Sequence, residues 1–120
     1  MENKDYVRLK HMLDSTKAIL SFTKGRRRGS LDNDRLLLSG VLRELEIIGE
    51  AAGRISDKTK KEFPEVPWKE LVGMRNRLIH AYFDVDHDII WNTIRKYLPT
   101  FLKQLQEIIE IFEEEYSILE

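Results

Sequence analysis

The apolar residues of this chain recur at the spacing of an α-helix, and no strand pattern competes with them. They step by three and four residues between positions 38 and 55, and again between 102 and 119. Such stepping gathers side chains on one helix face, which must then pack on other helices. The two stripes are Leu38, Val41, Leu45, Ile48, Ala52 and Ile55, and then Leu102, Leu105, Ile109, Phe112, Tyr116 and Leu119. The sequence therefore predicts an all-α, up-and-down bundle of four long helices with one or two short ones.

Polar and turn residues indicate where the helices begin and end. Two glycines around an arginine triplet end a first amphipathic helix, and Ser30 and Asp32 are the candidate N-caps of the next. Asp86 is the expected N-cap of a helix that runs through Tyr97. Pro99 is expected to start or kink the last helix.

The second half of the second helix is built from unusually small residues. Gly49, Ala51, Ala52 and Gly53 follow one another with only Glu50 between them. Small side chains let two helices approach closely, and this interpretation is favoured over a ligand site. Glu50 is expected at the surface, although a polar accessory role in a cleft is the alternative.

Length and composition exclude several classes of protein. A chain of 120 residues predicts one domain, spanning residues 1–120. The absence of cysteine excludes a disulfide, a thiol nucleophile and a zinc-thiolate site. Three scattered histidines without a metal-binding pattern predict no metal site, and nothing in the sequence predicts a cofactor. The charged N-terminus and the lack of a long apolar run predict a cytoplasmic protein without a membrane segment.

Charge is distributed unevenly along the chain, although its net value is only −1. Residues 1–60 hold 13 Lys and Arg against 9 Asp and Glu, a net +4, whereas residues 61–120 hold 7 against 12, a net −5. A contact with nucleic acid would therefore be local rather than spread over the whole surface.

The third long helix, expected from Trp68 to His80 or Tyr82 after a proline-containing loop, carries the residues with the clearest chemistry. Arg75 and Asn76 precede His80 by five and four positions. A histidine can move protons near neutral pH, and a guanidinium can grip phosphate oxygens. The plainer interpretation is that these are solvated charges near a helix C-terminus, where cations are favoured in any case.

Helical geometry places Asn76 and His80 on one face of the helix and Arg75 on another. Asn76 and His80 are one turn apart, so the amide could orient the imidazole. Arg75 and His80 are about 140° apart around the axis. A long arginine side chain or a second subunit would have to bring the two groups together. Arg75 and Tyr82, seven residues apart, align if the helix extends that far.

The surroundings of this motif resemble a known family. Residues 67–86, PWKELVGMRNRLIHAYFDVD, closely resemble the signature of the HEPN superfamily in its HepT-like branch, and residues 45–52, LEIIGEAA, are similar to the second helix of that branch. The resemblance implies a metal-independent ribonuclease toxin of a toxin–antitoxin pair, acting on RNA as a homodimer that brings two motifs into one cleft.

The resemblance also implies roles for individual residues. Arg75 and His80 match the family's R-x4–6-H motif, with Asn76 at its polar position, and would be catalytic. Tyr82 matches the tyrosine of an H-x-Y motif, onto which a minimal nucleotidyltransferase antitoxin transfers AMP. Such a partner is therefore expected, and no DNA contact is. The alternative is a non-catalytic helical module that only binds a nucleotidyltransferase.

A basic cluster offers a possible RNA contact outside the motif. It comprises Lys24, Arg26, Arg27 and Arg28, to which Arg77 of the third helix is added. A solvated loop between helices explains the four loop residues equally well.

Overall fold

The structure of the protein, a computed structural model, describes residues 3–80 and 85–119, with side chains for residues 3–79 and 85–115. All regular structure in these ranges is helical. The helices are α1 Lys4–Thr23, α2 Ser30–Asn33, α3 Arg35–Arg54, α4 Asp57–Glu62, α5 Trp68–His80, α6 His87–Asn92 and α7 Leu98–Leu119. None of the helices in the described ranges is long and apolar enough to cross a membrane.

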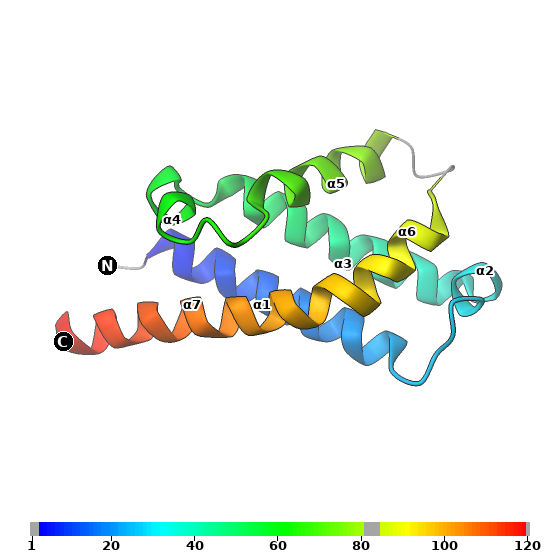
Figure 1. Ribbon diagram of the computed structural model, residues 1–120, viewed down its shortest axis with the longest axis horizontal. Helices are drawn as coiled ribbons and strands as arrows, with labels where there is room; N and C mark the ends of the chain where they lie inside the picture. The colour runs from blue at the N-terminus through cyan, green and yellow to red at the C-terminus, as the bar shows by residue number, and fades with distance from the viewer. Residues whose placement is uncertain (1–2, 81–84, 120) are drawn as a thin grey trace.

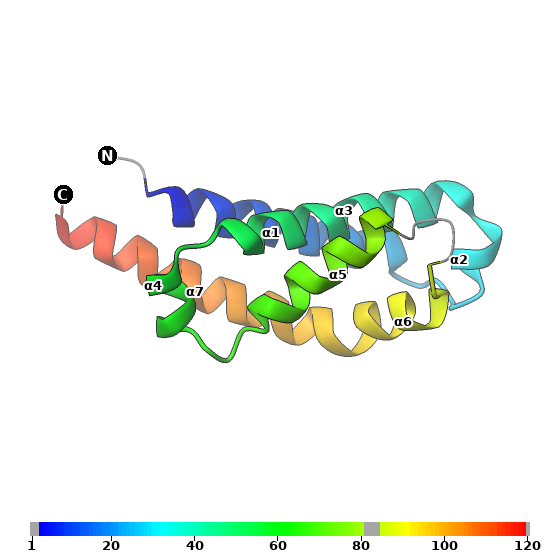
Figure 2. The same cartoon turned by 90° about the horizontal axis from the view of Figure 1, so that it is seen from above.

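The four long helices run up and down along the molecule. Figure 1 shows α1, α3, α5 and the α6–α7 rod alternating in direction along the long axis, with both termini at one end. In Figure 2, α1 and α3 lie together on one side, α7 lies on the other, and α5 crosses obliquely from the α7 side to α3. α3 packs on both α1 and α5, while α7 packs on α1. The predicted all-α, up-and-down bundle is confirmed.

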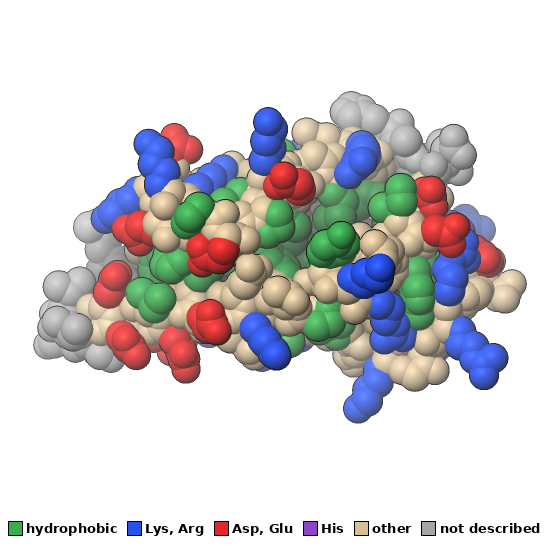
Figure 3. Space-filling view, in the orientation of Figure 1, with side chains coloured by type: hydrophobic (Ala, Val, Ile, Leu, Met, Phe, Trp, Pro, Cys, Tyr) green, Lys and Arg blue, Asp and Glu red, His purple; other side chains and the backbone are tan. Residues whose placement is uncertain are grey.

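The predicted apolar stripes supply much of the core. The stripe residues that are buried are Val41, Leu45, Ile48, Ala52, Ile55, Leu105, Ile109 and Phe112. Leu38 and Leu102 are half-buried at the edge of the bundle, and the side chains of Tyr116 and Leu119 lie outside the described residues. Hydrophobic side chains also show between α5 and the α6–α7 rod on the face drawn in Figure 3.

The start of α3 differs from the prediction. Ser30 and Asp32 lie within α2, a separate turn of helix, and the N-cap of α3 is Asp34. The Asp34 side chain accepts a hydrogen bond from the main-chain nitrogen of Leu37 at 3.0 Å. Asp32 instead accepts hydrogen bonds from side chains of other segments, so its carboxylate is not available as a cap.

The last two predicted helices are joined. Asp86 is the N-cap of α6, as predicted. However, the helix does not end before Pro99, because a π-helical turn at Thr93–Tyr97 connects α6 directly to α7. Within that turn the Leu98 nitrogen donates to the Thr93 oxygen, five residues back. Proline lacks the donor for one helical hydrogen bond and crowds the preceding turn, so a widened turn just before it lets the rod continue.

The loop before α5 is fixed by the first residue of that helix. Trp68 is buried, and its indole nitrogen donates to the main-chain oxygen of Phe63 at 2.9 Å. This contact holds the end of α4 against the start of α5. The residues with predicted chemistry therefore lie on a helix whose beginning is anchored.

Candidate functional site

Arg75 and Asn76 form the described part of the candidate site. Arg75 is half-buried on α5, and its Nη1 donates a hydrogen bond to Oδ1 of the exposed Asn76 at 3.2 Å. The guanidinium is thus oriented by its neighbour in sequence. The other N–H groups of this guanidinium can still donate hydrogen bonds to a phosphate or a carboxylate.

The position of Arg75 depends on Gly49 of α3. A Cβ atom built on Gly49 would lie 2.3 Å from Cβ of Arg75 and 2.7 Å from the main-chain oxygen of Leu71. No real side chain fits at such distances, so only glycine allows α3 and α5 to approach this closely. The predicted close helix–helix approach is confirmed at Gly49, and the residue that Gly49 contacts is the candidate Arg75.

His80 and Tyr82 were predicted to complete the site. His80 is the last residue of α5, but its side chain lies outside the described residues, as does Tyr82. The predicted contact between Asn76 and the imidazole and the alignment of Arg75 with Tyr82 therefore stay predictions. The described partner of Asn76 is Arg75.

Two arginines of the basic cluster are engaged by carboxylates. Arg28 donates to Asp88 of α6 and to Asp32 of α2, both at 2.6 Å, and Arg26 lies 3.3 Å from Asp34. Hydrogen bonds to Asp88 and Asp32 raise the pKa of the Arg28 guanidinium above its ordinary value. The Arg28 contact with Asp88 holds the loop between α1 and α2 against the start of α6.

His87 joins the same group of charges. Its Nδ1 lies 2.6 Å from Oδ1 of Asp32. The hydrogen bond from His87, followed by that from Arg28, lowers the pKa of the Asp32 carboxyl. Arg28 and His87 therefore both bind the carboxylate of Asp32, and His87 thereby ties the start of α6 to α2.

The other predicted contact residues lie at the surface. Lys24, Arg27 and Arg77 are exposed, and Arg77 lies on α5. Glu50 is exposed as well, and its Oε1 is 3.4 Å from Nη2 of Arg54. Among the described residues, no three His, Asp or Glu side chains are grouped so that they could hold a metal ion.

Comparison with known proteins assigns the chain to a family. The family model described as "Ribonuclease HepT-like" matches residues 12–108, a range that includes α3, α5, α6 and the first half of α7. The chain belongs to the HepT-like ribonuclease family. No solved structure matches it.

Curated relatives support membership of the HepT-like family. A "Putative RNase" of Methanocaldococcus jannaschii is 38% identical over 95 residues, which cover 79% of this chain and 87% of that protein. Another, from Caldanaerobacter subterraneus subsp. tengcongensis, is 39% identical over 102 residues, covering 85% and 91%. A "Probable ribonuclease HepT" of Thermococcus cleftensis is 40% identical over 75 residues, covering 62% and 68%.

Two features of this HepT-like chain were not found from the sequence. The contact between Gly49 and Arg75 joins residues of two helices, and the glycine-rich segment alone did not show which residue it would meet. A groove between α1 and α3, lined by Lys4, Arg8 and His11 among others, was also missed. The helical spacing of these three residues was the available signal, because it places them on one face of α1.

Proposed function

We propose that this chain is a metal-independent ribonuclease and the toxin of a two-gene toxin–antitoxin pair. The observation that carries the proposal is the oriented arginine: Arg75 is held by Asn76 on the helix that ends at His80, in a chain of the HepT-like family. The names of the curated relatives support RNA as the substrate class.

The proposed reaction uses only protons and charge. The 2′-oxygen of a ribose attacks the adjacent phosphorus, the bond from phosphorus to the 5′-oxygen breaks, and a 2′,3′-cyclic phosphate and a 5′-hydroxyl result. His80 removes the proton of the 2′-hydroxyl as general base or protonates the leaving 5′-oxygen as general acid. Arg75 stabilises the negative charge that builds on the phosphate, and Asn76 keeps the guanidinium in place.

A homodimer would supply both proton transfers at once. Since Arg75 and His80 lie about 140° apart on one helix, a second copy of α5 is the natural source of the missing group. Gly73 and Asn76 are three residues apart on one side of α5, and the Asn76 side chain is exposed there. A Cβ atom at Gly73 would meet nothing within 4 Å, so this side is open to an approaching helix. With two copies, one histidine acts as base and the other as acid.

Transfer of AMP to Tyr82 is the proposed means of control. A nucleotidyltransferase antitoxin would attach the adenylate phosphate to the phenolic oxygen and release pyrophosphate from ATP. The added nucleotide is bulky and negatively charged, and it would stand two residues from His80. It would therefore exclude RNA from the site by occupancy and by repulsion.

The test is cleavage of total tRNA and of a model mRNA in EDTA, using protein made without its antitoxin and shown by mass to be unmodified. Wild type is expected to cut, whereas His80→Ala should be slower by about 10²–10⁴-fold and Arg75→Ala by about 10²–10³-fold. The alternative, a module that only binds a nucleotidyltransferase, predicts no cutting by any of the three proteins. Equal cutting by all three would show that another nuclease is responsible.

A further inference from the structure

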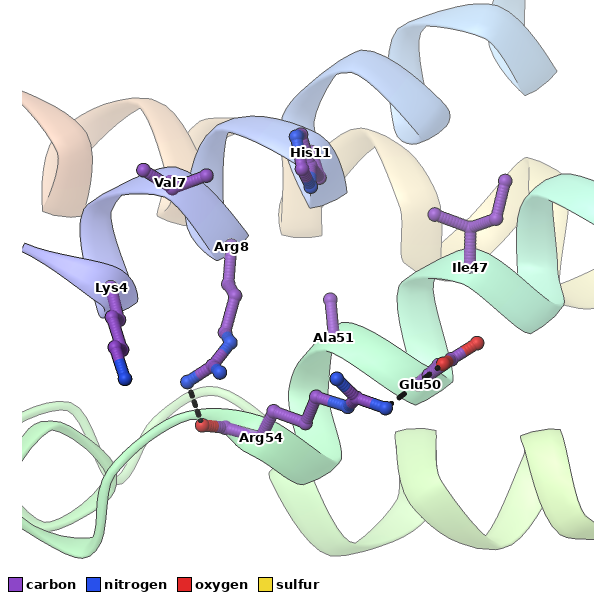
Figure 4. Close-up of a pocket in the computed structure, with 8 residues that line it drawn as sticks. All are labelled: Lys4, Val7, Arg8, His11, Ile47, Glu50, Ala51 and Arg54. Atoms are coloured by element: carbon purple, nitrogen blue, oxygen red, sulfur yellow. Dashed lines mark hydrogen bonds and ion pairs between the residues drawn. The ribbon is translucent and has the colours of Figure 1, made fainter.

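A second surface of the molecule is suited to RNA, on the side of α3 that faces away from α5. Here α1 and α3 enclose a groove of about 510 Å³. Its lining residues are Lys4, Val7, Arg8 and His11 of α1, and Ile47, Glu50, Ala51 and Arg54 of α3. Figure 4 shows Lys4 and Arg8 extending from α1 toward α3. This volume lies in the range of sites that bind small ligands. A groove of that size would hold a few nucleotides of an RNA strand.

The groove is rich in hydrogen-bond donors that carry positive charge. Lys4, Arg8 and Arg54 set three cations against the single carboxylate of Glu50, and His11 adds an imidazole. Lysine and arginine side chains are donors only, so they match the acceptor oxygens of a phosphate. Since the whole chain has a net charge of −1, this accumulation of positive charge is local.

One arginine of the groove, Arg8, is held in place before any ligand binds. Nη1 of Arg8 donates to the main-chain oxygen of Arg54 at 2.7 Å, across the end of α3. The Arg54 side chain is held more loosely, with Nη2 at 3.4 Å from Oε1 of Glu50. Figure 4 draws both contacts along the same wall of the groove. A guanidinium fixed in this way loses little side-chain entropy when it binds a phosphate.

The spacing of the groove residues fits a strand rather than a single ion. Lys4, Arg8 and His11 occupy successive turns of α1, roughly 4.5–6 Å apart along the helix axis. The floor between the basic groups is aliphatic, from Val7, Ile47 and Ala51. Such a surface can pack against ribose while the basic groups follow the backbone, as in single-strand binding channels.

A neighbouring hollow shows why the α1–α3 groove is the better candidate. Between α1 and α7, about 460 Å³ is lined by Lys17 and Lys103 together with Glu107, Glu110 and Glu113. There carboxylates outnumber lysines, so the hollow would repel a phosphate backbone. The two surfaces differ in charge but not greatly in size, and they share α1.

We propose that the α1–α3 groove binds the phosphate backbone of single-stranded RNA, on the side of α3 opposite the helix that carries the cleavage site. The inference rests on the proposed ribonuclease function. α3 connects the two surfaces, because Gly49 contacts Arg75 on one side of this helix while Ala51 and Arg54 line the groove on the other. The groove offers no base-reading contact along its floor, so it binds without regard to sequence.

The experiment compares two double variants that remove the same charge from different surfaces. Lys4→Gln with Arg54→Gln empties the groove of two cations, both on exposed residues. The Arg8 hydrogen bond is kept, because it goes to the main chain of residue 54. Lys17→Gln with Lys103→Gln makes the matched change in the α1–α7 hollow. Thermal unfolding checks that each variant is folded, and Lys4→Gln alone serves as a milder variant.

Binding of a short, labelled single-stranded RNA is measured by anisotropy over a range of salt concentrations, with His80→Ala added to prevent cleavage. The groove variant should bind about tenfold more weakly, with a salt slope smaller by about 1.4, since each lost contact contributes roughly 0.7. In the cleavage assay KM should rise while kcat is unchanged. The α1–α7 variant should match wild type.

Each contrary result has a distinct meaning. If the groove variant keeps its RNA affinity and salt slope while wild type cleaves normally, the proposal that the groove binds RNA is wrong, but the proposed ribonuclease function is not affected. Equal weakening by both double variants would also overturn it, because net charge would then be the cause. Weaker binding to a purified nucleotidyltransferase partner, with RNA affinity unchanged, would reassign the groove to an acidic protein. Failure of wild type to bind or cleave RNA would instead remove the proposed function.

Discussion

Gly49 sets the distance between α3 and α5, the helix that carries the candidate site. Its missing side chain leaves room for Cβ of Arg75 and for the main-chain oxygen of Leu71. The sequence indicated this close approach, because four small residues follow one another there. It did not indicate Arg75 as the neighbour, since that pairing depends on the register between two helices that a loop and a short helix separate.

Replacing Gly49 by alanine is expected to damage both stability and activity. The new methyl group would overlap with main-chain and side-chain atoms of α5, so α5 and Arg75 must move outward. Such overpacking costs about 1–3 kcal/mol, to be measured by urea unfolding together with RNA cleavage.

Gly53→Ala is the control, because its Cβ would lie 3.6 Å from Cγ2 of Val72, an ordinary contact. Gly53→Ala should retain activity and be as stable as wild type or more so, since alanine favours helix by about 0.5–1 kcal/mol. Equal effects of the two changes would contradict this account.

At the scale of elements, two tertiary contacts hold short segments that the sequence could only outline. The Asp32 carboxylate joins α2 to α6 through Arg28 and His87. The Asp5 carboxylate joins the first turn of α1 to the start of α4. The hydrogen bonds of Asp32 with His87 and of Asp5 with Ser56 and Thr59 each span more than 50 residues of sequence. Helical spacing carries no information about such pairs. For the same reason Asp32 was mistaken for an N-cap.

The Asp5 contact predicts a specific dependence of stability on pH. Asp5 is buried; burial raises its pKa, but hydrogen bonds from Ser56 and Thr59 outweigh that effect, and the net pKa is lowered. A carboxyl whose pKa is lower in the folded state stabilises the fold above its unfolded value of about 3.9. This contribution is lost as the pH falls through the folded pKa.

Asp5→Asn is therefore expected to cost about 1–3 kcal/mol at neutral pH, because it leaves buried donors poorly matched. The difference from wild type should shrink as the pH is lowered from about 7 to about 3. Urea unfolding at several pH values measures it, and Asp14→Asn, at an exposed position on the same helix, is the control. A difference that stays constant over this range would show that the charge of Asp5 does not stabilise the fold.

At the scale of the whole molecule, the architecture followed from the sequence more completely than the site did. Apolar stripes at helical spacing determine how many faces must be buried, and four long amphipathic helices have few ways to do so. The continuity of α6 and α7 was missed because proline usually ends a helix, and the widened turn that accommodates Pro99 has no clear sequence signal. The candidate site was predicted from residues on one helix, and the pattern of one helix does not indicate which other segment lies against it.

The proposed dimer can be tested at Gly73, on the outward side of α5. A Cβ atom there would meet nothing within 4 Å in the single chain, and arginine favours helix over glycine, so Gly73→Arg should fold at least as stably as wild type. Across a two-fold interface, however, two bulky groups of like charge would face each other and prevent close approach. Wild type is expected to sediment as a dimer at micromolar concentration, and Gly73→Arg as a monomer with little cleavage activity.

The added arginine is positive, so reduced activity would not come from repulsion of RNA. Gly73→Ala, which adds only a methyl group, should remain dimeric and active. A wild-type monomer that cleaves RNA would show that one chain completes the site alone, and a dimeric Gly73→Arg would place the interface elsewhere.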